Sequence, residues 1–185
     1  MSNLLTLPHR LDKKNATCQA IIETPKGSRN KYDFDPAAGL FCLAKLLPEG
    51  MVFPYDFGFV PSTVAPDGDP VDVMLFMDEP VPVGCLVPVR LIGVIEGEQT
   101  EDEKTTRNDR LVAVAIHSHT HQKTESLKQV NPRVTDEVEQ FFVYYNELQQ
   151  IKFRVLGQYG PNRAVQLVEK GAADFRKKAE KKKGK

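Results

Sequence analysis

Three carboxylates, Asp67, Asp69 and Asp72, are the residues of this chain whose type and spacing point most clearly to chemistry. Like charges so close together repel and raise one another's pKa values, so hard divalent cations with oxygen ligands are the natural counterweight. Gly68 frees the backbone here, whereas Pro70 fixes φ and removes a donor, which indicates a rigid turn that enters a strand. The alternative is a solvated Asp-Gly turn. An EF-hand loop fits poorly, because the sixth position counted from Asp67 is Asp72 and not glycine.

The charge of the surrounding sequence agrees with cation binding. Ten acidic residues and a single basic residue, Arg90, lie between Asp67 and Glu103. The last ten residues of the chain hold seven bases and one acid, which is typical of a solvated helix end. The whole chain has a formal net charge of zero, which argues against general attraction to nucleic acid, so we expect no nucleic-acid partner.

Length and composition limit the architecture and the compartment. The 185 residues are 41% hydrophobic, so we expect a single domain over residues 1–185, with flexible tails at residues 1–12 and 179–185. Cys18, Cys42 and Cys85 form neither a C-x-x-C pair nor an even disulfide set, which favours a reducing compartment. The sequence shows neither a signal-peptide pattern nor eighteen consecutive apolar residues, so we expect a cytoplasmic protein that engages no membrane.

The apolar pattern predicts the elements that must position these residues. Strands are predicted at Ala16–Thr24, Leu40–Leu46, Val71–Met77, Leu86–Ile95 and Leu111–His117. A helix capped by Thr135 or Asp136 follows, with an apolar face formed by Val138, Phe141, Phe142, Tyr145 and Leu148. After a short strand at Lys152–Gln158, Pro161 opens a second helix that turns inward Ala164, Leu167, Val168 and Phe175. This order indicates an α+β, mainly β fold, in which a small closed or partly closed barrel is flanked by two C-terminal helices.

The run His117-Ser118-His119-Thr120-His121 is a separate feature. If the segment is extended, its three imidazoles share one face and could bind Zn²⁺ or another transition metal. The alternative is a solvated strand end, since no thiolate or spaced second ligand pair accompanies the histidines.

The order of these motifs resembles the soluble family I inorganic pyrophosphatases. The Asp-x-Asp-Pro-x-Asp motif of that family is matched in full by Asp67 to Asp72. The resemblance spans roughly residues 16 to 178, and its other matching segments are Ile22-Glu23-Thr24-Pro25, Lys31-Tyr32-Asp33, Phe53 to Phe59, Arg110 to Val114 and Phe141 to Tyr145.

The resemblance implies both a fold and a reaction. The fold is an oligonucleotide-fold-like barrel of five strands, and the reaction is the metal-dependent hydrolysis of pyrophosphate to two phosphates by a metal-activated water. Mg²⁺ is the implied cofactor, with Mn²⁺ or Zn²⁺ as substitutes, and the implied assembly is a homo-oligomer, in bacteria commonly a hexamer.

The same resemblance assigns roles to individual residues. Asp69 is the implied general base and also contacts metal, while Asp67 and Asp72 ligate the central pair of metal ions. Glu23 and Asp33 match acidic positions that hold additional Mg²⁺. The residues that match phosphate-binding positions are Lys31, Lys45, Arg110 and Tyr145.

Several positions depart from the family pattern. Lys45 replaces the usual arginine and loses its planar fork. Two usual active-site tyrosines are Phe53 and Phe57, which keep the rings and lose the hydroxyl donors. Asn108 stands where a metal-binding aspartate is usual, and Asn146 stands where a lysine is usual.

Another carboxylate must replace the one lost at Asn108 if the metal site is complete. The candidates are Asp109, through a shifted backbone, or one of Glu101, Asp102 and Glu103 in the longer preceding loop; of these we expect Asp109 and Asp102. The departures leave two alternatives to pyrophosphate hydrolysis open. One is a hydrolase of another phosphoanhydride or phosphate ester, and the other is a non-catalytic barrel that binds phosphate or nucleic acid.

Overall fold

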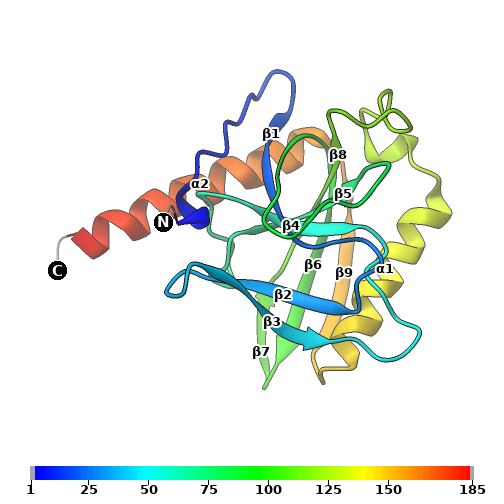
Figure 1. Ribbon diagram of the computed structural model, residues 1–185, viewed down its shortest axis with the longest axis horizontal. Helices are drawn as coiled ribbons and strands as arrows, with labels where there is room; N and C mark the ends of the chain where they lie inside the picture. Colours follow the sequence, from blue (N-terminus) through cyan, green and yellow to red (C-terminus); the bar gives the residue numbers. More distant parts are fainter. Residues whose placement is uncertain (1–2, 184–185) are drawn as a thin grey trace.

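The computed structural model describes residues 3–183. Figure 1 shows a β-barrel with a short hairpin beside it and one helix on each of two sides. The elements are η1 (Leu4–Thr6), β1 (Thr17–Thr24), β2 (Asn30–Asp35), β3 (Leu40–Leu46), β4 (Asp56–Val60), β5 (Val71–Phe76), β6 (Leu86–Glu101), β7 (Lys104–Arg107), β8 (Arg110–Ala115), η2 (Leu127–Gln129), α1 (Pro132–Glu147), β9 (Lys152–Tyr159) and α2 (Pro161–Lys183).

Five strands form a closed ring. They follow one another in the order β1-β4-β5-β8-β6, and β6 pairs back with β1. Strands β5 and β8 pair in parallel, and the other pairs of the ring are antiparallel. Strand β6 runs on beyond the ring to pair with β7 and β9. The ring confirms the predicted five-stranded barrel, because closure leaves no free edge among these strands.

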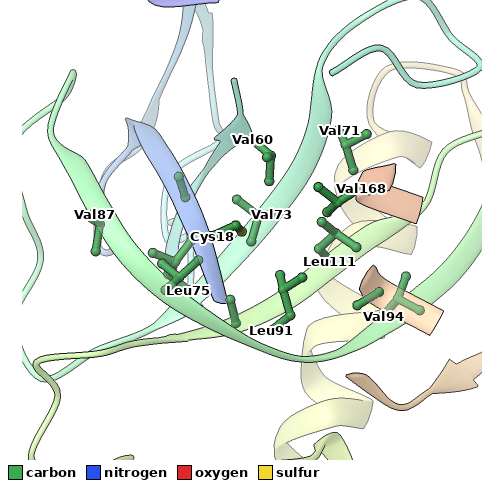
Figure 2. Close-up of a cluster of buried hydrophobic side chains, with 14 of the residues drawn as sticks. Cys18, Val60, Val71, Val73, Leu75, Val87, Leu91, Val94, Leu111 and Val168 are labelled. Atoms are coloured by element: carbon green, nitrogen blue, oxygen red, sulfur yellow. The ribbon is translucent and has the colours of Figure 1, made fainter. Parts of the chain in front are cut away.

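Alternating side chains fill the barrel, as Figure 2 shows. On β5, Val71, Val73 and Leu75 point into the barrel interior, where Val168 of α2 closes one end. The intervening Met74 and Phe76 belong to a second buried cluster beneath α1. Strand β5 is therefore covered on both faces, which is why its sequence reads as a continuous apolar run after Asp72.

Helix α1 begins earlier than the sequence predicted. Asn131 is its N-cap and accepts a hydrogen bond from Arg133 N, and Pro132 occupies the first turn. The predicted cap at Thr135 or Asp136 is therefore wrong, because Thr135 is a buried helical residue whose hydroxyl donates to Pro132 O. The expected inward position of Leu148 is also wrong: this residue follows the last helical turn and is exposed.

Helix α2 begins at Pro161 as predicted, and its Ala164 and Val168 are buried in the barrel cluster. Its later turns lie beside the N-terminal segment, where a cavity is lined by both Leu5 and Phe175. In that segment Leu4, Leu5 and Leu7 pack against a small cluster formed by Ile21, Phe34 and Phe59. The sequence did not predict these contacts for residues 3–12.

Strands β2, β4 and β7 were not predicted. Strands β2 and β3 form a two-stranded hairpin outside the ring, drawn below the barrel in Figure 1. The hairpin is joined to β1 by a hydrogen bond from Tyr32 N to Thr24 Oγ1 (3.3 Å). Neither of the two α-helices in residues 3–183 is long and apolar enough to cross a lipid bilayer.

The histidine run does not continue strand β8, which ends at Ala115. The chain turns here around Asp78, whose carboxylate accepts hydrogen bonds from Ser118 Oγ, His119 N and Thr120 N. The alternative of an extended segment with three imidazoles on one face therefore does not hold, because alternation of faces requires a strand.

Candidate active site

A cavity of about 370 Å³ lies beside the barrel where the Asp67–Asp72 turn, the β2–β3 hairpin and the end of α1 meet. Strand β5 follows the turn, β8 lies next to β5, and β6 next to β8. The residues that line the cavity are Lys31, Asp33, Lys45, Phe53, Phe57, Asp67, Asp69, Asp72, Gln99, Glu101, Asn108, Arg110, Phe142, Tyr145, Asn146, Gln149 and Ile151. Eight of the residues expected from the sequence are therefore brought to one cavity.

The Asp67–Asp72 turn is fixed by hydrogen bonds on both sides. Asp69 N donates to Asp67 Oδ1 (3.2 Å), and Ala65 N donates to Asp69 O (2.7 Å). Gly68 has a φ of 101°, a left-handed conformation that favours glycine. After the turn, Val71 N donates to the buried Thr63 Oγ1 (2.9 Å). A hydrogen-bonded turn that enters a strand is present as predicted, and its three carboxylates line the cavity.

Asp33, Asp67, Asp69 and Asp72 form an acidic wall of the cavity, and two cations lie among these carboxylates. Arg110 Nη1 is 2.5 Å from Asp72 Oδ2, and Lys31 Nζ is 3.3 Å from Glu23 Oε2. Lys31 also pairs with Asp33. Glu23 lines an adjoining cavity of about 300 Å³ together with Asp33 and Asp69, and these two aspartates also line the main cavity. Glu23, Asp33 and Asp72 thus pair with the two cations, whereas Asp67 and Asp69 pair with neither in residues 3–183, which leaves excess negative charge.

The pKa values of three carboxylates are raised, mainly by burial and also by neighbouring negative charge. Burial, and then the charges of Asp72 and Asp69, raise the pKa of Asp67 to about 6. Burial, together with Asp72 and Asp33, raises the pKa of Glu23 to about 7 although Lys31 opposes the shift. Burial likewise raises the pKa of Asp72, against the opposing charge of Arg110. Carboxylates whose ionisation is opposed by burial and by neighbouring negative charge fit a bound divalent cation.

The carboxylates are not yet gathered around a common point. Within residues 3–183, no three or more His, Cys, Asp or Glu side chains are grouped closely enough to hold a metal ion as they stand. Lys31 and Arg110 are paired with three of the carboxylates. Oxygen ligands in this number suit a hard divalent cation.

The opposite wall belongs to the hairpin and α1. Lys45 on β3 contacts Gln149 Oε1, and its ammonium lies 6.0 Å from the centre of the Tyr145 ring. Gln149 in turn donates to Tyr145 O (2.9 Å). Lys45 and Tyr145 therefore line the same cavity as the carboxylates of the Asp67–Asp72 turn.

Comparison with known proteins decides the family. The family model described as inorganic pyrophosphatase matches residues 20–176. The chain belongs to the inorganic pyrophosphatase family. It is 32% identical over 163 residues to an inorganic pyrophosphatase of Synechocystis sp., covering 88% of this chain and 94% of that protein. It is 35% identical over 152 residues to the one from Thermus thermophilus, covering 82% of this chain and 84% of that protein.

Solved structures of inorganic pyrophosphatases share the fold. The crystal structure of the Thermus thermophilus protein matches with a TM-score of 0.86 at 30% identity, over 95% of this chain and 99% of that chain. The Helicobacter pylori protein matches with a TM-score of 0.83 at 26% identity, over 92% of this chain and 98% of that chain. Members of the family thus share the barrel and both C-terminal helices with this chain.

Asp109 and Asp102 do not reach the cavity. Residues alternate between faces at the start of β8, so Asn108 and Arg110 line the cavity and Asp109 points to the other side. There it accepts from Gly97 N (3.1 Å) and pairs with Arg107 (2.7 Å), beside a separate cavity along α2. Asp102 lies in the exposed β6–β7 turn. Of the four acids considered as replacements for the lost carboxylate, Glu101 is the one that lines the cavity.

A network of charges holds Asp109 on its side of the sheet. Arg107 Nη2 donates to Glu96 Oε2 (2.6 Å) as well as to Asp109. Arg163 of α2 donates from Nε to Glu96 Oε1 (2.6 Å). Although burial alone would raise the pKa of Glu96, the two arginines lower it below its ordinary value of 4.5. Glu96 thus joins α2 to the barrel.

At position 108, where the family usually has an aspartate, the amide of Asn108 pairs with the amide of Gln99. Asn108 Nδ2 donates to Gln99 Oε1 (2.6 Å), and Asn108 Oδ1 accepts from Arg110. Asn146 is buried and donates to Phe142 O (2.8 Å). The sequence did not single out Gln99, Phe142 or Gln149 for the cavity. In the β6–β7 hairpin Gln99 lies opposite Thr106, two residues before Asn108, so the register of this hairpin could have identified Gln99 as a neighbour of Asn108. It could not have identified Phe142 or Gln149.

Proposed function

We propose that this protein hydrolyses inorganic pyrophosphate to two phosphates, with Asp69 as the general base. The observation that carries the proposal is the single cavity in which the Asp67–Asp72 turn faces Lys31, Lys45 and Arg110. Dense negative charge on a diphosphate needs cations around it, and the attacking water needs a base, and both are available here. Membership of the inorganic pyrophosphatase family supports the same reaction.

Asp69 is the carboxylate best suited to accept a proton. Asp72 is paired with Arg110, and Glu23 and Asp33 are paired with Lys31. Asp67 accepts from Asp69 N. The Asp69 carboxylate, by contrast, has no hydrogen-bond or ion-pair partner among residues 3–183, and Asp69 is exposed. An uncommitted carboxylate at the mouth of a charged cavity can take the proton of an attacking water without breaking an existing contact.

We propose Mg²⁺ as the cofactor, with Mn²⁺ or Zn²⁺ as substitutes. The residues that would hold it are Asp67, Asp69 and Asp72, with Glu23, Asp33 and Glu101 around them. When bound, the cation would neutralise charge on the substrate and lower the pKa of water. The raised pKa values of Glu23 and Asp67 support this role, because a nearby cation favours the ionised carboxylates that Mg²⁺ requires.

The cations of the cavity have the complementary task. Arg110 and Lys31 would donate hydrogen bonds to phosphate oxygens from the acidic wall, and Lys45 from the hairpin. Tyr145 lines the cavity beside Lys45, where its hydroxyl would donate to the substrate. Together they would orient the two phosphates between the base and the α1 wall.

The test is phosphate release by the purified protein from pyrophosphate, with Mg²⁺, Mn²⁺ or Zn²⁺ and with chelator as control. Tripolyphosphate, ATP and p-nitrophenyl phosphate complete the panel. We expect metal-dependent release with pyrophosphate as the best substrate. Faster release from another compound would favour a different phosphoanhydride or phosphate-ester hydrolase, and no release from any of them would reject hydrolysis.

We also propose that the protein is a homo-oligomer, with a hexamer favoured, and that it is cytoplasmic. The exposed Leu40, Leu43 and Leu46 on β3 support association, since within residues 3–183 this strand pairs with β2 and with no other strand. Free Cys18, Cys42 and Cys85 support a reducing compartment. Light scattering that gives the 20.8 kDa mass of one chain would reject the oligomer, and fractionation into another compartment would reject the location.

A further inference from the structure

Each of the three cations of the cavity lies over an aromatic ring. Lys31 Nζ is 5.7 Å from the centre of the Phe57 ring, and Arg110 Cζ is 5.8 Å from the same ring. Arg110 Cζ is also 5.4 Å from the centre of Phe142, and Lys45 Nζ is 6.0 Å from that of Tyr145. Two of the three cations, Lys31 and Arg110, therefore lie over the ring of Phe57, and Arg110 also lies over that of Phe142.

The setting favours strong cation–π attraction. The side chain of Arg110 is 8% exposed, and its Nε is buried without a hydrogen-bond partner in the part of the chain that the structure describes. Phe57 and Phe142 are 5% and 2% exposed, and their ring centres are 5.9 Å apart. Attraction between a cation and the face of a ring grows when both are shielded from water. Phe57 and Phe142 thus form one buried aromatic surface from β4 and α1, and Arg110 lies against it.

This surface differs from the other partners of the cations in one respect. The ionic partners of Lys31 and Arg110 are Glu23, Asp33 and Asp72, which are also proposed to hold metal. A carboxylate that turns to a metal ion gives up its cation, whereas an aromatic ring keeps its contact. The rings are the partners that can hold the cations in place while the carboxylates are engaged elsewhere.

We propose that Phe57, together with Phe142, is a positioning residue that holds Lys31 and Arg110 in place to bind the phosphates of the substrate. The proposal rests on the proposed function, since it assigns these cations to phosphate. It gives a role to a ring without a hydroxyl: the face of Phe57 acts through the two cations and does not touch the reacting atoms.

Phe53 provides a matched control. It lines the same cavity, is 2% exposed, and has its ring centre 5.8 Å from that of Phe57. No cation lies over its ring among the described residues; its aromatic contacts are with Phe57, Phe141 and Tyr145. Replacing either ring by leucine removes a similar amount of buried aromatic surface, but only one replacement removes cation–π contacts.

The experiment compares Phe57→Leu with Phe53→Leu in two assays. The first separates KM from kcat for pyrophosphate, and the second measures by calorimetry the Kd of methylene diphosphonate, a non-hydrolysable analogue. We expect Phe57→Leu to raise both KM and Kd about tenfold, because two cation contacts are lost together. We expect its kcat to change less than about twofold, since contacts to the phosphates hold substrate and transition state alike. Phe57→Tyr keeps the ring, so its KM for pyrophosphate and its Kd for methylene diphosphonate should stay close to the wild-type values.

Equal effects of Phe57→Leu and Phe53→Leu on KM and Kd would overturn the proposal, as would Phe57→Tyr behaving like Phe57→Leu. If the leucine variant fails to fold, phenylalanines with increasing fluorine substitution at position 57 keep the shape and weaken the negative ring face. Affinity for the diphosphonate should then fall with each added fluorine, and an unchanged affinity would overturn the proposal. Failure of the wild-type protein to release phosphate would reject the proposed function, while the diphosphonate assay would still test the role of the rings.

Discussion

Replacing Arg110 by methionine should destabilise the metal-free protein, and Mg²⁺ should restore most of the loss. Arg110 is the cation 2.5 Å from Asp72, a carboxylate that Asp69 and Asp33 also repel. Removing one partner of a fully buried pair costs about 3 to 5 kcal/mol. Here the Arg110 and Asp72 side chains are 8% and 22% exposed, so solvent screening reduces the expected cost to about 2 kcal/mol.

The assay is thermal unfolding with chelator and with saturating Mg²⁺. For a chain of this size, a loss of about 2 kcal/mol lowers Tm by roughly 4 to 8 °C. Mg²⁺ should raise the Tm of Arg110→Met by several degrees more than that of the wild type, because the cation replaces the missing charge without displacing an arginine. The control is Arg154→Met, which removes an arginine paired with Glu98 at 2.7 Å on the surface. Its Tm should change little, with no dependence on Mg²⁺.

Two results would refute this reasoning. A metal-free Arg110→Met protein as stable as the wild type would mean that Arg110 does not balance the acidic wall. A loss of stability that Mg²⁺ leaves unchanged would mean that the cation does not bind near Asp72.

Two further predictions concern the sheet around the cavity. Glu96→Gln should lower the free energy of unfolding by about 1 to 2 kcal/mol, because it weakens the contacts of buried Glu96 to two partly exposed arginines. Because the folded pKa of Glu96 lies below 4.5, this contribution is present above pH 4.5 and is lost as pH falls through the folded pKa. Urea unfolding should therefore show a smaller difference in unfolding free energy between wild type and Glu96→Gln below pH 4 than at pH 7. A difference that stays constant would contradict this prediction. Glu101→Gln should raise the Mg²⁺ concentration for half-maximal activity severalfold, whereas Asp102→Asn next to it should change it less than about twofold, because Glu101 lines the cavity and Asp102 does not. Metal titrations in which the two variants respond alike would remove Glu101 from the site.

The sequence predicted four of the five barrel strands, β1, β5, β6 and β8, because they are strongly patterned, and it missed β4. Strand β5 differs from its prediction by one residue, and Leu40–Leu46, which lies outside the ring, was predicted with the observed bounds. Strand β2 was missed although it carries Lys31 and Asp33, since half of its six residues are charged and its inner side chains are few. The start of α1 was missed because Asn131-Pro132 is as good a cap signal as Thr135, and the choice between them depends on tertiary packing.

The candidate site was predictable where a motif fixed the spacing. The turn from Asp67 to Asp72 is a local feature, so its sequence determines its geometry. The replacement for the carboxylate lost at Asn108 was not predictable, because it depends on which way each residue from Asn108 to Arg110 faces where the chain enters β8. One step along a strand reverses the side chain, and this separates Asp109 from the cavity that Asn108 and Arg110 line. The contacts between cations and rings depend on elements far apart in sequence, and no local pattern reports them.

The most direct test of the central claim is phosphate release from pyrophosphate with saturating Mg²⁺ by Asp69→Asn beside the wild type. Asparagine keeps the shape of Asp69 and its backbone bond from Ala65 N, but cannot accept the proton of an attacking water. We predict that turnover falls at least about 10²-fold while Tm and the Kd of methylene diphosphonate change little. An Asp69→Asn protein that turns over pyrophosphate as fast as the wild type would contradict the account, because Asp69 would then not be the base.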